Sequence, residues 1–341
     1  LSIRRQRQMC IRDRACMPQK SPVYAVTRIR VHEKDMVKPE RMARMAEASP
    51  AEVMRALGDI GYGGISDPQL SDGDRMIAKE LSDAYALINE VTFSPEQTDL
   101  FILKGDANNL KLLIKQRLTG TADSPALMKG VYPKDDIIRM VHNADYRELP
   151  EEFTKRLNAL EQSFSGEIDP GRISTEIDRA YLEHCLNNAK GVSLEYFKSL
   201  ADFTNLLTML RMRNMGAGAD KLKNSLMPEG YVSHRLLIQC FDGPEEGIAR
   251  AAATGPARES ILKGLEEYGR SGRLTELERQ RDNYLISLFK GAKFAEGGIE
   301  PLIGYLLGRE QEAKCLRLII TAKRNNLPDK VITERLGELY G

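Results

Sequence analysis

Two adjacent acids, Asp135 and Asp136, are the residues of this 341-residue chain that most resemble a magnesium site. Paired carboxylates can hold a divalent cation between helices. This pair follows Pro133, however, and proline together with acids is typical of the first turn of a helix. Stabilisation by the helix dipole is therefore the preferred interpretation, and the pair predicts the start of a helix.

The histidines and cysteines do not group into a catalytic or metal site. The four histidines stand singly, without the HExxH or Glu-x-x-His spacing of zinc and di-iron sites. The five cysteines form no CxxC pair, which favours a reduced, cytosolic chain. No GxxxxGK[ST] loop is present, and no glycine cluster follows a strand. We therefore assign no catalytic, cofactor-binding or metal-binding residue and expect no cofactor.

A motif that occurs three times carries hydrogen-bonding groups at helical spacing. An acid is followed three residues later by a polar residue and leucine, then by an apolar pair, then by a base. The copies are Asp106, Asn109-Leu110, Leu113-Ile114 and Arg117; Asp202, Asn205-Leu206, Met209-Leu210 and Arg213; and Glu312, Cys315-Leu316, Ile319-Ile320 and Lys323.

The two asparagines of the motif admit two interpretations. Asparagine inside a helix is unfavourable unless its amide is bonded. Asn109 and Asn205 either fix the helix register inside each unit or line a polar cavity that binds a partner. The structural role is preferred because Cys315 replaces asparagine in the third copy.

The bases near the ends of the same helices also have two possible roles. Arg117, Arg213 and Lys323 either satisfy terminal carbonyl groups, which is more common, or contact an acidic partner. Together with Asn109, Asn205 and Arg317, these bases are the candidates for partner binding.

The spacing of the motif indicates a repeated helical unit of domain size. The acids are separated by 96 and 110 residues, too far apart for a short-period solenoid. Pro133 and Pro228 follow Asn109 and Asn205 by 24 and 23 residues, whereas Pro328 follows Cys315 by only 13. We expect units at 21–105, 106–201 and 202–341, the last with a short C-terminal copy. Whether that copy closes a ring with the first unit stays open.

The helix signals predict an all-α fold. Ser49-Pro50-Ala51-Glu52 has a serine N-cap, proline at the first helical position and glutamate placed to bond back, and Ser94-Pro95-Glu96-Gln97 repeats this pattern. Pro133, Pro150 and Pro328, each followed by acids, mark further starts. The run from Val23 to Val31 could form a strand, but its continuation favours a helix.

Composition excludes several classes of protein. Residues 1–20 hold six bases and one acid, which leaves 44 bases and 48 acids in the remainder, so a nucleic-acid-binding face is not expected. No apolar run approaches the length of a membrane span. Residues 1–20 are interpreted as a non-native or disordered leader, with Met17 as a plausible start.

Several segments together resemble the C subunit of V-type and archaeal-type rotary ATPases, the family that includes the d subunit of the eukaryotic vacuolar pump. The resemblance covers 21–341. It is carried by Glu300-Pro301-Leu302-Ile303-Gly304-Tyr305-Leu306-Leu307-Gly308-Arg309-Glu310-Gln311-Glu312, Leu316-Arg317-Leu318-Ile319, Leu327-Pro328, Glu334-Arg335-Leu336, Tyr24 to Arg30, Leu57 to Gly63, Glu176-Ile177-Asp178 with Tyr181, and Asp202 to Arg211.

This resemblance implies an all-helical funnel of three similar units around a pseudo-threefold axis. It also implies a non-catalytic rotor part that joins the central-shaft subunits to the proteolipid ring at the cytoplasmic face of the membrane. Contact with the membrane would be made through partner subunits alone. The competing hypothesis is a helical scaffold or adaptor that binds a partner helix in a groove. The transported ion, H⁺ or Na⁺, and the direction of ATP turnover stay open.

Overall fold

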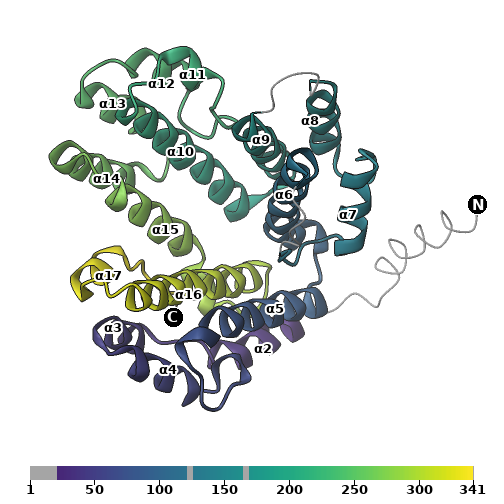
Figure 1. Ribbon diagram of the computed structural model, residues 1–341, viewed down its shortest axis with the longest axis vertical. Coiled ribbons are helices and arrows are strands. Elements are labelled where there is room, and N and C mark those ends of the chain that lie inside the picture. The colour runs from purple at the N-terminus through teal and green to yellow at the C-terminus, as the bar shows by residue number, and fades with distance from the viewer. Residues whose placement is uncertain (1–20, 121–125, 164–168, 341) are drawn as a thin grey trace, which may run out of the picture.

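The computed structural model describes residues 21–120, 126–163 and 169–340, and every regular element in these ranges is a helix (Figure 1). The prediction of an all-α fold is therefore confirmed. The segment from Val23 to Val31 lies within a helix, as expected. The expected leader lies outside the described residues.

The N-terminal part of the chain contains four α-helices and two 3₁₀ turns. They are α2 (Pro22–Glu33), α3 (Pro39–Glu47), α4 (Pro50–Gly58), η1 (Tyr62–Gly64), η2 (Leu70–Asp72) and α5 (Gly73–Val91). The middle part contains α6 (Pro95–Thr119), α7 (Lys134–His142), α8 (Glu151–Gln162), α9 (Pro170–Asn188) and α10 (Gly191–Asn214). The remainder contains α11 (Ala219–Lys223), α12 (His234–Cys240), α13 (Glu245–Ala252), α14 (Arg258–Ser271), α15 (Thr275–Lys290), η3 (Gly291–Phe294), α16 (Glu300–Arg324) and α17 (Asp329–Arg335).

Proline and N-capping residues start many of these helices. At α4 the Ser49 hydroxyl accepts from the Glu52 amide while the Glu52 carboxylate accepts from the Ser49 amide, so the predicted capping box is confirmed. The predicted start of α6 is confirmed, but the predicted cap is wrong. The Ser94 hydroxyl donates to the Glu96 carboxylate and accepts no hydrogen bond from a backbone amide of the helix. The other expected prolines occupy the N-cap, one residue before α7, α8 and α17.

Three long helices, α6, α10 and α16, each pack antiparallel against a second long helix. These three have 25, 24 and 25 residues, and their partners are α9, α15 and α5. Ion pairs cross each pair: Lys111 with Asp178, Arg211 with Glu278, and Arg324 with Asp74. In Figure 1 the three pairs lie around a common centre, with the shorter helices outside them.

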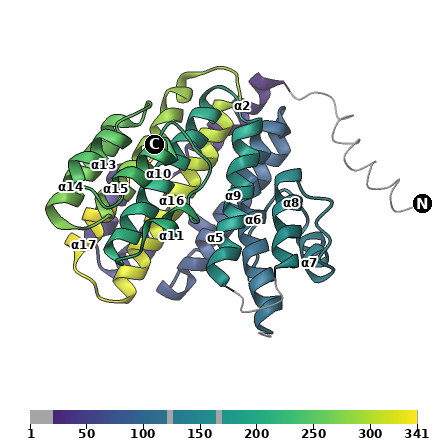
Figure 2. The same cartoon turned by 90° about the horizontal axis from the view of Figure 1, so that it is seen from above.

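The chain's two ends form the third of these pairs. α16, near the C-terminus, contacts α2, α3, α4 and α5 from the N-terminal part (Figure 1). Gly304 and Gly308 on α16 leave room for Tyr340, since a Cβ at either glycine would lie within 2.7 Å of that side chain. Figure 2 shows α2 near one end of the long helices. The C-terminal motif copy thus packs against the N-terminal region.

The buried side chains form three clusters. The central cluster joins α2, α5, α6, α9, α10, α15 and α16. A second cluster joins α3, α4 and α5 to the C-terminal half of α16, and a third lies between α10 and α11–α15. In the central cluster Phe101, Tyr196, Phe197 and Phe289 pack with ring centroids 4.8 to 6.1 Å apart. These four rings join α6, α10 and α15 at the place where the pairs meet.

A buried polar contact joins two pairs beside these rings. The Glu310 carboxylate of α16 accepts hydrogen bonds from Tyr85 of α5 and Lys104 of α6. Only 16% of the Glu310 side chain is exposed, so its charge needs both partners.

Candidate functional site

The first copy of the acidic motif binds the backbone of the segment that follows α6. Asp106 and Asn109 lie one turn apart on α6, so both side chains face this segment. The Asp106 carboxylate accepts from the amides of Val131, at 2.6 Å, and Tyr132, at 3.4 Å. The Asn109 amide donates to the Met128 carbonyl and accepts from the Met128 amide, both at 2.9 Å.

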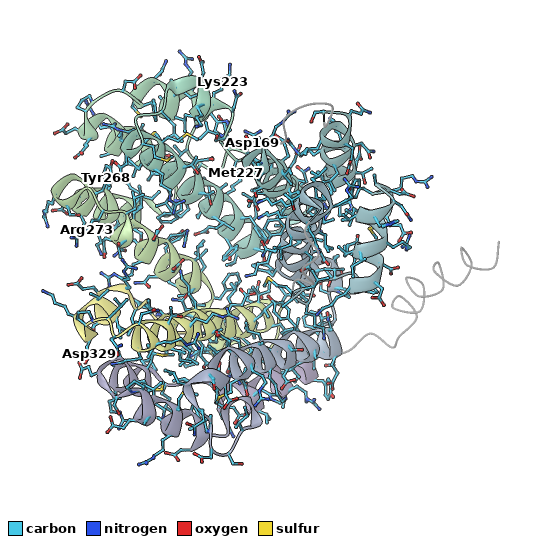
Figure 3. All side chains as sticks on the ribbon, in the orientation of Figure 1. Asp169, Lys223, Met227, Tyr268, Arg273 and Asp329 are labelled. Atoms are coloured by element: carbon cyan, nitrogen blue, oxygen red, sulfur yellow. The ribbon has the colours of Figure 1, made fainter. Side chains whose placement is uncertain are left out.

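The second copy makes the same kind of contact on α10. The Asp202 carboxylate accepts from the amides of Tyr231 and Val232 at 2.9 to 3.0 Å. The Asn205 amide donates to the Met227 carbonyl at 3.2 Å and accepts from the Met227 amide at 2.6 Å (Figure 3 labels Met227). Both asparagines therefore bind the backbone of a segment that follows their own helix.

The third copy binds a segment from the opposite end of the chain. Glu312 on α16 accepts from the Val37 amide at 2.5 Å, just before α3, and pairs with Arg309 at 2.9 Å. Cys315 Sγ makes long contacts of 3.9 Å with the Gly337 carbonyl and with the Gln311 amide nitrogen. The N-terminal segment thus occupies the place that a following segment has in the other two copies.

The bases of the motif bind near the ends of short helices. Arg117 donates to the Val141 carbonyl near the C-terminus of α7 at 2.6 Å and also pairs with Glu161. Arg213 donates to the Gly243 carbonyl after α12 at 2.9 Å. Lys323 pairs with Asp329 at the start of α17, at 2.7 Å (Figure 3 labels Asp329). Each base therefore holds a short helix against its long one.

Two glycines that were not among the predicted residues complete the first two copies. A Cβ at Gly130 would lie 2.0 Å from Asp106 Oδ1, and a Cβ at Gly230 would lie 2.1 Å from the Lys198 carbonyl oxygen. Only glycine lets each segment approach its helix this closely. A sequence pattern could have identified these glycines, because each precedes a Val-Tyr or Tyr-Val pair shortly before a helix start.

The spacing pairs Pro228 with Pro133, but only Pro133 lies at a helix start. Pro133 is the N-cap of α7, whereas α12 begins at His234, with Ser233 as its N-cap. Pro228 instead lies in the extended segment, where its carbonyl is 3.4 Å from the Asn205 amide nitrogen. Ser233 follows Asn205 by 28 residues, whereas Pro133 follows Asn109 by 24, so the residue that occupies the place of Pro133 is Ser233, which the spacing of prolines alone could not reveal.

Burial changes the titration of the three acids. Burial raises the pKa of Asp106 to about 7, although the amides of Val131 and Tyr132 oppose that shift. Burial likewise raises the pKa of Asp202 and of Glu312, against the backbone amides at the first and Arg309 at the second. Burial thus disfavours the charged form of each acid, while the backbone amides that donate to its oxygens favour it.

The candidate partner-binding residues differ in their accessibility. Asn109 and Asn205 are each 1% exposed and Lys323 is 8% exposed, while Arg117 and Arg213 are half-buried. All five bind other residues of the chain. Arg317 is exposed, and it makes no hydrogen bond or ion pair with another residue in the described ranges. The structure does not bring these six residues into one site.

The adjacent acids that resembled a magnesium site have a structural position in a helix. Asp135 and Asp136 lie in the first turn of α7, and Asp136 pairs with Arg139 at 3.0 Å. Within 21–120, 126–163 and 169–340, no three His, Cys, Asp or Glu side chains gather as metal ligands would. In the same ranges, no helix is long and apolar enough to cross a bilayer.

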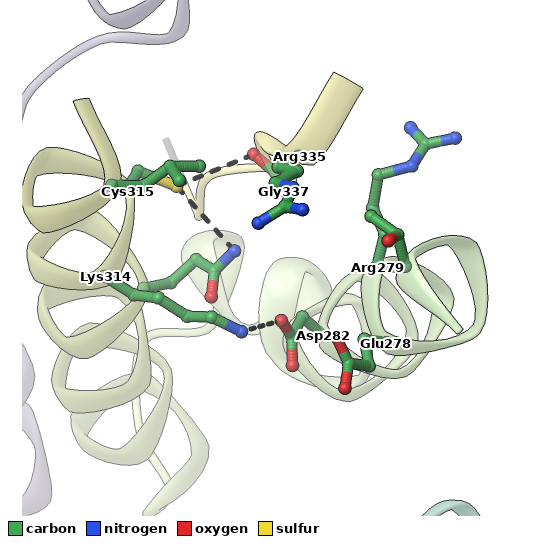
Figure 4. A pocket seen from close by; sticks show the side chains of 10 residues that line it. Glu278, Arg279, Asp282, Lys314, Cys315, Arg335 and Gly337 are labelled. Atoms are coloured by element: carbon green, nitrogen blue, oxygen red, sulfur yellow. Dashed lines mark hydrogen bonds and ion pairs between the residues drawn. The ribbon is translucent and has the colours of Figure 1, made fainter. Parts of the chain in front are cut away.

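A pocket lies between α15, α16 and the turn after α17 (Figure 4). Its volume is about 230 Å³, and its walls carry Glu278, Asp282, Lys314 and Arg335. A second hollow of about 320 Å³ lies where α8 and α9 meet the segment after α11. There Arg179 donates to the Leu226 carbonyl at 2.8 Å, so its charge already supports the contact between two helix pairs.

The sequence matches a family model and several characterised proteins. The model described as ATP synthase (C/AC39) subunit matches residues 25–335. The C subunit of the V-type sodium ATPase of Enterococcus hirae is 23% identical over 322 residues, which cover 92% of this chain and 97% of that protein. The C subunits of the A-type ATP synthases of Pyrococcus horikoshii and Thermococcus kodakarensis are 23% and 24% identical, each over 93% of this chain and 90% of their own.

Proposed function

The chain belongs to the ATP synthase (C/AC39) subunit family, and from this membership we propose that it is a non-catalytic rotor subunit of a V/A-type rotary ATPase. In this role it joins the central-shaft subunits to the proteolipid ring of the membrane. Rotation is then transmitted between ATP turnover in one part of the complex and H⁺ or Na⁺ movement in the other. The match over 25–335 is the observation that carries the proposal.

The arrangement of the helices supports a socket. We propose that the three long-helix pairs are equivalent units around a pseudo-threefold axis, forming a funnel. The support is the repeated contact pattern: a buried acid on α6, α10 and α16 binds a backbone segment in each case. Close-packed helices resist compression and transmit strain, which suits a joint under torque.

The unit boundaries follow from the same contacts. The expected boundaries at 105/106 and 201/202 lie inside α6 and α10. We propose instead that the units comprise 95–188, 191–290, and 300–341 together with 21–91. Each unit then holds one long-helix pair and the short helices that this pair supports.

The location and partners follow from the proposed role. The chain sits peripherally at the cytoplasmic face, reaches the membrane through the proteolipid ring, and binds no nucleic acid. A stable joint of this kind needs a total buried interface of roughly 2,000 Å² or more. Among the candidates, Arg317 is the exposed residue and therefore the one best placed for an acidic partner.

Native mass spectrometry tests this proposal. The full chain is mixed with the purified central-shaft subunits from the same genome, and the proteolipid ring is added afterwards. We expect a complex with one copy of this chain, which the ring then captures. A folded, helical chain that forms no complex at micromolar concentration would contradict the socket and favour a scaffold that binds an isolated helix.

A further inference from the structure

The pocket of Figure 4 has walls from two different helix pairs. α15 contributes Glu278, Arg279 and Asp282, whereas Gln311 and Lys314 lie on α16 and Arg335 ends α17. Its volume of about 230 Å³ admits a side chain. It does not admit a helix, which is about 10 Å across. Any occupant therefore enters as a side chain and touches both pairs at once.

The two acids of the pocket already have basic partners. Glu278 is 2.5 Å from Arg211 Nη2 on α10. Asp282 pairs with Lys314 across the pocket and with Arg281 at 2.9 Å. Arg279, in turn, is held by Glu276 at 2.8 Å. These pairs leave no free carboxylate among the acids that line the described pocket.

Arg335 is the charge in the pocket that these pairs do not neutralise. It is exposed and makes no hydrogen bond or ion pair with another residue that the structure describes. Figure 4 places it between the side chains of α16 and those of α15. The nearby Gln311 amide nitrogen bonds only to Cys315 Sγ, at 3.9 Å, within the same ranges. The guanidinium presents the planar set of N–H groups that a carboxylate matches, and the Gln311 amide in the lining of the same pocket is a further donor.

We propose that this pocket receives the carboxylate side chain of an acidic segment of the central shaft. The inference rests on the proposed function and adds a contact point to it. An acid bound to Arg335 between α15 and α16 would tie two helix pairs to the shaft, which a torque-transmitting joint requires. Arg317, exposed three residues after Lys314, adds positive charge on the same helix and favours the approach of an acidic segment.

Charge reversal at Arg335 tests the contact. The dissociation constant of the chain for the shaft subunits is measured for wild type, Arg335→Glu and Arg335→Gln. We expect about tenfold weaker binding for the first and a smaller loss for the second, with a steeper effect at low salt. Arg235→Glu, at an exposed arginine on α12 that also lacks a described partner, is the matched control and should bind like wild type. Circular dichroism checks that each variant is folded.

A coupling experiment identifies the occupant. Arg335→Lys places an amine in the pocket, and a carbodiimide then joins it to a carboxylate in contact. We expect a coupled peptide from a shaft subunit in the assembled complex. Coupling to the proteolipid ring instead would overturn this inference, as would equal affinity of Arg335→Glu and wild type for the shaft subunits. Neither result would contradict the proposed function. Failure of wild type itself to bind the shaft would overturn the proposed function.

Discussion

At the scale of residues, the buried acids act as acceptors for backbone amides. Asp106 is 0% exposed, and the amides of Val131 and Tyr132 are its partners. A buried amide left without an acceptor costs about 1–3 kcal/mol. The acids therefore stabilise the segments that lead into the short helices, a role that the spacing of acid and asparagine alone did not establish.

Asp106 should make stability depend on pH. Its pKa is raised from 3.8 to about 7, so the folded state holds the proton more tightly than the unfolded state. The free energy of unfolding should therefore fall as the pH rises through this interval and change no further above it. Asp106→Asn keeps one acceptor oxygen and cannot ionise, so it should lose less stability between pH 5 and pH 8, by about 2–3 kcal/mol. Urea unfolding at several pH values measures this difference, and parallel profiles would contradict it.

Gly130 should tolerate no side chain. Gly130→Ala would place a Cβ 2.0 Å from Asp106 Oδ1, so the segment must move away from α6. We expect a loss of about 1–3 kcal/mol in the free energy of unfolding. Gly291→Ala is the control, because no atom lies within 4 Å of its Cβ position and its φ is −63°. That variant should stay within about 0.5 kcal/mol of wild type, and similar losses at both sites would refute the explanation.

At the scale of elements, Glu312 connects the two ends of the chain. Val37 donates to it from just before α3, and Arg309, only 4% exposed, has Glu312 as a charged partner. The second buried cluster combines side chains of α3–α5 with those of α16. Neither end can complete this cluster alone.

Glu312→Ala should destabilise the N-terminal and C-terminal regions of the chain together. It removes the acceptor of Val37 and the nearest acid of buried Arg309, at a cost of roughly 3–5 kcal/mol. We expect faster hydrogen exchange in 37–57 and in 313–339, and unchanged exchange in 206–265, which belongs to the third cluster. Faster exchange confined to α16 would show that the two ends do not form one cooperative unit.

Helix positions were predictable because their signals are local. Ser49 with Glu52, and proline before acids at Pro133 and Pro150, mark starts through contacts within one turn. The pairing of α16 with α5 was not predictable, because it depends on contacts between opposite ends of the chain. Similarly, the spacing identified Asn109 and Asn205, but not which backbone groups they bind. The Ser94 cap failed because its hydroxyl donates to Glu96 instead.

At the scale of the whole molecule, the central cluster holds the three helix pairs together. Four of its aromatic rings, Phe101, Tyr196, Phe197 and Phe289, come from α6, α10 and α15, and Glu310 of α16 binds α5 and α6 beside them. The second and third clusters lie farther out, and each belongs to one pair with its short helices. The central cluster is therefore the largest shared contact through which a load on one pair reaches the others, beside peripheral contacts such as Arg179 with the Leu226 carbonyl and Lys314 with Asp282.

Substitutions of two buried phenylalanines can distinguish the role of the central cluster from that of the third cluster. Phe289 contacts Phe101 and Tyr196 in the central cluster, whereas Phe241 lies in the third cluster, and the two are 0% and 1% exposed. Each substitution, Phe289→Leu or Phe241→Leu, should cost about 1–2 kcal/mol through lost packing. Phe289→Leu should raise hydrogen exchange in all three helix pairs, because Phe289 belongs to the central cluster, to which all three pairs contribute side chains. Phe241→Leu should raise it only within 203–277. If both variants changed the same single region, the central cluster would not be the joint between the pairs, and the stiffness required by the proposed rotor function would have to come from other contacts.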